Sequence, residues 1–256
     1  MHLVRQIASL GLVSGLGLMA IACDAAPFAS EPAVVVDPAE GSTESTEVST
    51  SSSGSPIPPI EGTYTINGTN PSGSEYEGTM TISRETGKFY TVDWQIGEQE
   101  FQGLGLLEAQ SLSVGWGDAS CLVVAYEVAD QTLGKGRWFV LGEEEIGTEH
   151  VTRTKGRSDG IDGTYGVKGR NPDGSQYEGT LAVTAQDQSY RFAWQVGEDN
   201  FEGVGIQAGE TVAVGWGQGN CSVAVYEVNP EGQLTGLWST EGGKALGIET
   251  AIPIQE

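Results

Sequence analysis

The turn that decides the fold occurs twice: residues 70–79 read Asn-Pro-Ser-Gly-Ser-Glu-Tyr-Glu-Gly-Thr, and residues 171–180 read Asn-Pro-Asp-Gly-Ser-Gln-Tyr-Glu-Gly-Thr. An Asn-Pro-x-Gly sequence suits a type I turn closed by a glycine with positive φ, which is the chemistry of a β-hairpin. A calcium loop is the other interpretation of the second copy. Ser72 stands where that copy has Asp173, and a dedicated calcium site needs several clustered oxygen ligands, so a plain hairpin turn is favoured.

The match between the copies extends outward from this turn in a fixed order. Gly-Thr-Tyr begins both copies, at 62–64 and 163–165, and Gly-Trp-Gly recurs at 115–117 and 215–217. Further matched pairs are Trp94 and Trp194, Phe101 and Phe201, Cys121 and Cys221, Trp138 and Trp238, and Glu149 and Glu249. A module was therefore duplicated. We expect β repeat 1 at residues 61–150, a linker at 151–161 and β repeat 2 at 162–256.

Alternation of side chains predicts antiparallel strands. Tyr90, Val92 and Trp94 face one way, while Thr91 and Asp93 face the other. Such a period of two, with polar residues at the outer positions, is typical of strands buried on one face. Turn residues separate the strands, and glycines inside strands mark the bends that curl a sheet.

The predicted fold class is all-β, with seven or eight short strands in each copy in up-and-down order. We expect two small antiparallel barrels, or strongly curled sheets, in tandem. One larger barrel or sandwich built from both copies is the alternative. Eight strands can close a barrel filled by side chains, which favours two domains.

The N-terminus predicts export. Residues 1–22 combine a short basic start with an apolar run too short to span a bilayer comfortably, as in a signal peptide. Ala20-Ile21-Ala22-Cys23 resembles the lipobox of bacterial lipoproteins, which implies acylation of Cys23 and anchoring in a membrane. Asp24 resembles a signal for retention in the inner membrane, but this rule does not hold in every bacterial group, so the choice between inner and outer membrane stays open.

Residues 23–60 connect this anchor to the repeats. They are rich in Ser, Thr, Pro and Glu and contain a single aromatic residue, Phe28. Such a segment cannot bury enough surface to offset its chain entropy, so it is expected to be a disordered tether. The whole chain of 256 residues carries 35 acidic and 12 basic residues, a formal charge of −23. A field of that sign repels nucleic-acid phosphates, and we expect no nucleic-acid partner.

Trp116 and Trp216 are the candidate ligand-binding residues. They could form an aromatic platform at a barrel mouth, or they could be core rings with glycines that allow a neighbouring backbone to approach. Trp116 shares its parity with Leu112 and Val114, and this favours the core.

Cys121 and Cys221 begin the same strand in each copy. Their parity with apolar neighbours favours small buried hydrophobes. A disulfide is the other interpretation in an exported protein, although equivalent positions in separate barrels are usually too far apart to join.

No catalytic site is expected. After removal of the signal peptide, His150 is the single histidine of the chain, and the second copy lacks it. The repeated pairs Glu77/Glu178, Glu98/Glu198 and Glu127/Glu227 are conceivable catalytic carboxylates, but Glu77 lies on a polar strand face and Glu127 at a strand end. We expect no cofactor and no metal.

The motifs Gly-Thr-Tyr, Asn-Pro-x-Gly-Ser-x-Tyr-Glu-Gly-Thr, Trp-Gln-(Ile/Val)-Gly, Phe-x-Gly-x-Gly and Gly-Trp-Gly together resemble a family of exported bacterial repeat proteins often labelled fibronectin-binding. The resemblance covers residues 61–149 and 162–249. It implies an exported β module and identifies no binding residue. The first hypothesis for the function is a non-enzymatic binding or adhesin-like module in the cell envelope, with a protein ligand such as extracellular matrix. A structural envelope lipoprotein without a small ligand is the alternative; an enzyme or an enzyme inhibitor is a distant third.

Overall fold

The computed structural model describes residues 58–254, except 88, 119–120, 140–144 and 218. The predicted signal peptide, the lipobox with Cys23 and almost all of the predicted tether lie outside the described residues. All the regular elements of the described part are β-strands. No helix among the described residues is long and apolar enough to cross a membrane.

Each repeat contributes eight strands. The first gives β1 (Gly62–Thr69), β2 (Glu75–Thr86), β3 (Phe89–Ile96), β4 (Gln99–Glu108), β5 (Ser111–Gly117), β6 (Leu122–Ala129), β7 (Thr132–Trp138) and β8 (Gly147–Gly156). The second gives β9 (Gly163–Arg170), β10 (Gln176–Gln186), β11 (Ser189–Val196), β12 (Asp199–Ala208), β13 (Thr211–Gly217), β14 (Cys221–Val228), β15 (Leu234–Ser239) and β16 (Gly247–Pro253).

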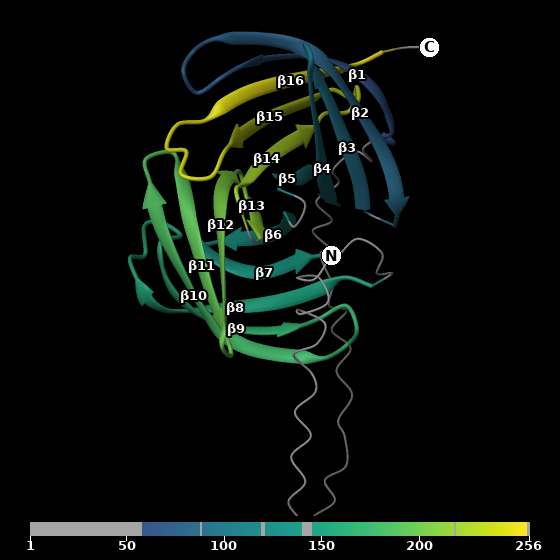
Figure 1. Ribbon diagram of the computed structural model, residues 1–256. Coiled ribbons are helices and arrows are strands. Elements are labelled where there is room, and N and C mark those ends of the chain that lie inside the picture. The colour runs from purple at the N-terminus through teal and green to yellow at the C-terminus, as the bar shows by residue number, and fades with distance from the viewer. Residues whose placement is uncertain (1–57, 88, 119–120, 140–144, 218, 255–256) are drawn as a thin grey trace, which may run out of the picture. The chain divides into compact units, whose positions relative to one another are not determined.

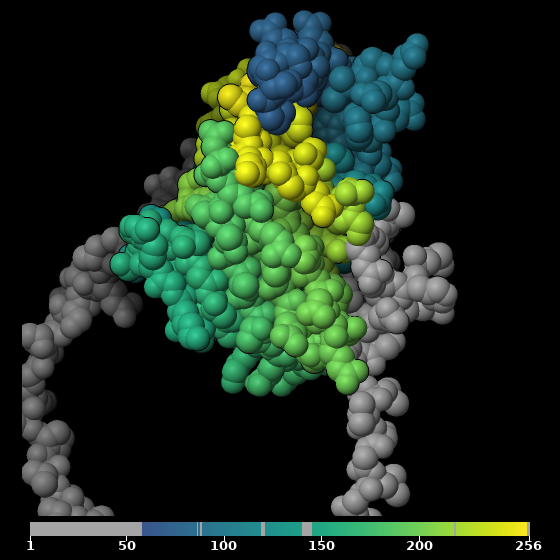
Figure 2. Space-filling model, turned by 60° about the vertical axis from the view of Figure 1, so that its left-hand side comes forward, coloured from purple at the N-terminus to yellow at the C-terminus, as the bar shows by residue number. Residues whose placement is uncertain are grey.

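The strands form two closed antiparallel barrels of eight strands, which confirms the predicted fold class (Figure 1). Barrel A runs in the order β1-β16-β15-β14-β5-β4-β3-β2, and barrel B in the order β10-β11-β12-β13-β6-β7-β8-β9. Each barrel therefore takes five strands from one repeat and three from the other. Figure 2 shows this mixing on the surface, where yellow C-terminal residues adjoin blue residues of the first repeat.

This division of strands corrects the expectation of one barrel per repeat. The consecutive strands β5 and β6 do not form a hairpin, because β5 pairs with β14 and β6 pairs with β13. The expected linker at 151–161 is also corrected, since β8 continues to Gly156 and pairs with β9 inside barrel B. The two repeats have the same pattern of residues, so a strand finds equivalent partners in either copy and the local sequence does not choose between them.

Glycines of the Gly-Trp-Gly motifs permit the exchange. Where the chain passes from barrel A to barrel B, the carbonyl of Leu122 lies so close to Gly115 that a Cβ there would be 2.4 Å from its oxygen. The equivalent distance from Gly215 to the carbonyl oxygen of Ser222 is 2.1 Å. No larger residue fits these positions without moving backbone.

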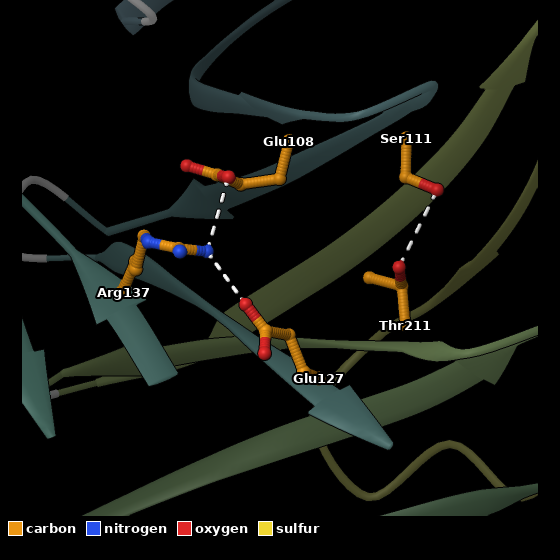
Figure 3. A network of polar contacts seen from close by, with 5 residues as sticks. All are labelled: Glu108, Ser111, Glu127, Arg137 and Thr211. Carbon is orange, nitrogen blue, oxygen red and sulfur yellow. Dashed lines mark hydrogen bonds and ion pairs between the residues drawn. The ribbon is translucent and has the colours of Figure 1, made fainter. Parts of the chain in front are cut away.

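Pairs of equivalent residues contact each other where the two copies meet. Cys121 and Cys221 form a disulfide, with their Cα atoms 5.4 Å apart. Ser111 and Thr211 lie with their hydroxyl oxygens 3.5 Å apart (Figure 3). A residue can touch its own equivalent only near an axis that relates the copies, so the repeats are arranged about a pseudo-twofold axis.

Apolar residues on the outside of the barrels pack between them. One cluster joins Phe89 and Leu106 of barrel A to Val123 and Ala125 of β6, and a second, equivalent cluster joins β12 and β13 to β14. Strand β6 is thus buried on both faces, which explains why Leu122–Tyr126 is continuously apolar instead of alternating.

A polar contact borders the first cluster. Arg137 of β7 donates from one nitrogen to Glu108 of β4, at 3.1 Å, and to Glu127 of β6, at 2.9 Å (Figure 3). Leu237 occupies the equivalent position in the second repeat and packs against the second apolar cluster. The two sides of the interface therefore differ in chemistry although the strands are equivalent.

The local predictions about turns and cores hold. Gly73 and Gly174 have φ of 89° and 87°, and each donates its amide to the asparagine carbonyl of its turn. Tyr90, Val92 and Trp94 all lie inside barrel A. At one end of each barrel a tyrosine hydroxyl donates to a backbone carbonyl at 2.7 Å, from Tyr64 to Ile60 and from Tyr165 to Ile161, and the buried isoleucines fill that end.

The exchange predicts the behaviour of one isolated repeat. A fragment of residues 58–160 has strands β1–β8 but lacks β14 and β13, which pair with β5 and β6 in the full chain. We expect two copies to exchange strands and form a dimer with two barrels, because Gly115 allows the close approach of Leu122 that this path requires. Light scattering after size-exclusion chromatography measures the mass, and a folded monomer would contradict the prediction.

Candidate functional site

The candidate site is a cavity of about 370 Å³ inside barrel A. Three tryptophans and two tyrosines contribute to its wall, with one carboxylate. These residues are Tyr76, Trp94, Trp116, Tyr226, Trp238 and Glu249. Tyr76, Trp94 and Trp116 come from the first repeat and the other three from the second, so the strand exchange assembles the site.

Glu249 of β16 is the polar centre of this cavity, and only 3% of its surface is exposed. Its Oε1 accepts hydrogen bonds from the Tyr226 hydroxyl at 2.7 Å and from the Trp94 indole at 3.3 Å. Its Oε2 accepts from the Tyr76 hydroxyl at 2.8 Å. All three donors are neutral, and within the described residues Glu249 has no ion-pair partner.

The same arrangement recurs in barrel B around Glu149, which accepts from Tyr126, from Tyr177 at 2.9 Å and from Trp194 at 3.4 Å. Indoles donate to the two tyrosine oxygens as well, Trp194 to Tyr126 and Trp138 to Tyr177, both at 3.2 Å. Each tyrosine oxygen accepts from an indole, which directs its own proton to the carboxylate.

Burial sets the protonation behaviour of these carboxylates. Loss of water raises the pKa of Glu249, and the hydrogen bonds from Tyr226, Tyr76 and Trp94 oppose this. Burial likewise raises the pKa of Glu149 against the bonds from Tyr126, Tyr177 and Trp194. Burial and the adjacent carboxylate also raise the pKa of Tyr226, so this phenol stays a proton donor.

Glycines on neighbouring strands leave the space in which the aromatic rings lie. Gly68 pairs with Tyr76 in register, and a Cβ on Gly68 would lie 2.1 Å from the tyrosine ring. Gly247 pairs with Trp238, where a Cβ would lie 2.1 Å from the indole. Each ring lies across a bare backbone, a pairing known to support glycines in sheets. The glycines of the repeat therefore hold the site as well as bend the sheet.

The two barrels differ in how much space remains. The cavity among the tryptophans inside barrel B measures only about 50 Å³. Glu149 also borders a separate hollow of about 550 Å³, which charged side chains such as Lys168 and Glu178 line. Phe201 lines the smaller cavity and meets the Trp216 ring edge-on, with the centroids 5.6 Å apart. Its equivalent in barrel A, Phe101, is 38% exposed. The same set of polar residues therefore has a large cavity beside it in barrel A and a small one inside barrel B.

The structure places each residue that the sequence singled out. Trp116 and Trp216 line the cavities of barrels A and B. Trp216 is buried and Trp116 is partly buried, so each ring combines features of a ligand platform and of a core residue. Cys121 and Cys221 are buried and joined in a disulfide, so the usual separation of equivalent positions does not apply here. Their apolar parity neighbours lie between the barrels instead of inside one.

Sequence reasoning missed Glu149 and Glu249 as site residues. The pair was visible as a match between the copies, but the acids considered were Glu77, Glu98, Glu127 and their equivalents. A usable signal existed, because Glu249 alternates with Gly247 and Ala251 on a strand face where an acid is otherwise unexpected. An acid repeated on a small, apolar strand face predicts a buried carboxylate.

Comparisons with known proteins add little. No protein-family model matches the chain, and no curated protein matches it. A search of solved structures gives a porin-like protein from Bacteroides uniformis, 9% identical, covering 77% of this chain and 98% of that chain, with a TM-score of 0.23. A likeness this weak gives no basis for carrying that protein's fold or role over to this chain.

The buried carboxylate predicts a specific pH dependence. Because the pKa of Glu249 is raised above 4.5 in the folded state, the folded protein binds that proton more tightly than the unfolded chain does. The contribution of Glu249 to the free energy of unfolding is therefore most favourable at low pH and decreases as pH rises from about 4.5 through the folded-state pKa.

Chemical denaturation of the wild type and Glu249→Gln between pH 4 and pH 8 measures this. The wild type should lose stability relative to the variant as pH rises. Glu77→Gln removes an exposed carboxylate and controls for the change in net charge. A difference that stays constant or grows with pH would refute the assignment.

Proposed function

We propose that this protein is a non-enzymatic binding protein of the bacterial cell envelope, anchored by lipid on Cys23, which holds a small ligand inside barrel A. The observation that carries the proposal is the cavity of about 370 Å³ around Glu249. Sites for small molecules usually measure about 300–1,000 Å³ and combine apolar walls with a few polar groups. Barrel A has this size and this composition.

Barrel B does not offer a comparable site. A cavity needs on the order of 10–15 Å³ for one water molecule, so about 50 Å³ holds a few waters and no organic ligand. The buried indole nitrogen of Trp216 has no hydrogen-bond partner within the described residues, which suits a water-sized space beside it. We infer that, of the two barrels in the described residues, barrel A holds the ligand site.

The chemistry of the site supports binding more than catalysis. Acid–base and nucleophilic catalysis need two groups with different roles within reach of one another. The cavity of barrel A holds one carboxylate, and neutral donors already occupy it on both oxygens. Its tyrosines keep their protons because burial raises their pKa values. These groups can orient a bound ligand and present a negative charge to it.

The anchor can be tested directly. Because the lipobox ends at Cys23, we expect Cys23→Ser to abolish incorporation of labelled palmitate and to move the protein from the membrane fraction to the soluble fraction. Cys121→Ser retains the lipobox and should remain labelled and membrane-bound. Palmitate labelling that persists in Cys23→Ser would exclude this anchor.

Ligand capacity can be tested with N-phenyl-1-naphthylamine, an uncharged apolar fluorophore of suitable size. We expect saturable binding at one site per chain, seen as energy transfer from tryptophan. Ile96→Trp should obstruct the open cavity and abolish binding. Val196→Trp, the equivalent change in barrel B, should leave it intact, because these two residues line the two cavities.

Absence of binding to the wild type would favour the alternative of a structural envelope lipoprotein. Equal loss in both tryptophan variants would place the fluorophore outside barrel A. Circular dichroism of both variants distinguishes obstruction of the cavity from failure to fold.

A further inference from the structure

We propose that the ligand of barrel A is an organic cation with a methylated ammonium head, held by the Glu249 carboxylate within walls formed by Trp94, Trp116 and Trp238. This rests on the proposed binding function and adds the chemical class of the ligand. Three features of the cavity support it: an uncompensated buried charge, a set of indole walls and the net charge of the chain.

The buried charge is the first feature. An isolated carboxylate is costly to remove from water unless it is paired or fully hydrogen-bonded. A carboxylate offers about four acceptor positions, and three are used by Tyr76, Trp94 and Tyr226. In the part of the chain that the structure describes, no Lys, Arg or His forms an ion pair with Glu249. A cation in the cavity would supply the missing positive charge.

The indole walls are the second feature. Trp94 and Trp116 have ring centroids 5.6 Å apart at 49°, and Trp116 and Trp238 have centroids 6.4 Å apart at 64°. All three line the cavity. Tryptophan is the aromatic side chain that attracts cations most strongly, within about 6 Å of its ring centroid, and cages of such rings recognise quaternary ammonium groups. A methylated head also needs no acceptor for an N–H, which matches a carboxylate already accepting three bonds.

The net charge is the third feature. With 35 acidic and 12 basic residues the chain carries −23, which raises the local concentration of cations and disfavours anionic ligands. A neutral ligand would enclose Glu249 without compensating its charge. Among cationic, anionic and neutral ligands, cations therefore suit both the electric field around the protein and the interior of the site.

Choline and its uncharged carbon isostere 3,3-dimethyl-1-butanol provide the test, since they share a shape and differ in charge. Titration of the full chain is followed by tryptophan fluorescence, because the three indoles line the site. We expect choline to bind saturably and the isostere at least tenfold more weakly. Glu249→Gln should lower the ratio of choline affinity to N-phenyl-1-naphthylamine affinity at least tenfold.

Matched variants locate the effect. Glu149→Gln and Trp216→Leu change the equivalent residues of barrel B and should leave choline binding unaltered. Trp116→Leu should weaken choline binding while keeping an apolar wall. Near-ultraviolet circular dichroism establishes that each variant is folded, and Trp116→Leu keeps the proposal testable if Glu249→Gln fails to fold.

The outcomes separate the two proposals. Three results would overturn the proposal of a cationic ligand: equal affinity for choline and its isostere, choline binding unchanged in Glu249→Gln, or no choline binding. Saturable binding of N-phenyl-1-naphthylamine would still support the ligand-binding function. If neither choline nor N-phenyl-1-naphthylamine binds, both proposals fail.

Discussion

The exchange of strand partners at the pseudo-twofold axis is the constraint on which the rest of the structure depends. β5 and β6 are consecutive in the chain, yet they lie in different barrels, and β13 and β14 repeat this arrangement. Neither barrel can close without three strands of the other repeat. The disulfide between Cys121 and Cys221 fixes this crossing and links positions 100 residues apart. In the chain-entropy model, a cross-link that closes a loop of that length raises the free energy of the unfolded chain by about 4.7 kcal/mol.

The exchange also builds the candidate sites. Glu249 lies on a strand of the second repeat, whereas Tyr76 and Trp94, which donate to it, lie on strands of the first. Barrel B reverses these contributions around Glu149. Each repeat therefore contributes residues to both cavities. The register of the strands matters equally, because the rings of Tyr76 and Trp238 fit only opposite Gly68 and Gly247.

Duplication has given the two barrels the same set of interior residues but different amounts of free space beside them. Phe201 packs on Trp216 in barrel B, while Phe101 is exposed in barrel A. In both barrels the buried glutamate accepts hydrogen bonds from two tyrosines and a tryptophan, and these bonds stabilise the barrel interior. Of the two barrel interiors, that of barrel A has the space for a small molecule beside this network, which is why the proposed ligand site lies in barrel A.

The sequence by itself determined the local features of this protein. The Asn-Pro-x-Gly turns, the strand faces that carry Tyr90 and Trp94, and the all-β class follow from turn chemistry and alternation, which act between near neighbours. Only the tertiary structure decided which copy each strand pairs with, because the two repeats offer equivalent partners. It also decided that Cys121 meets Cys221 and that Glu149 and Glu249 are enclosed by aromatic rings. Those outcomes depend on long-range contacts across the pseudo-twofold axis, and a pattern read along one chain carries no information about distance between its copies.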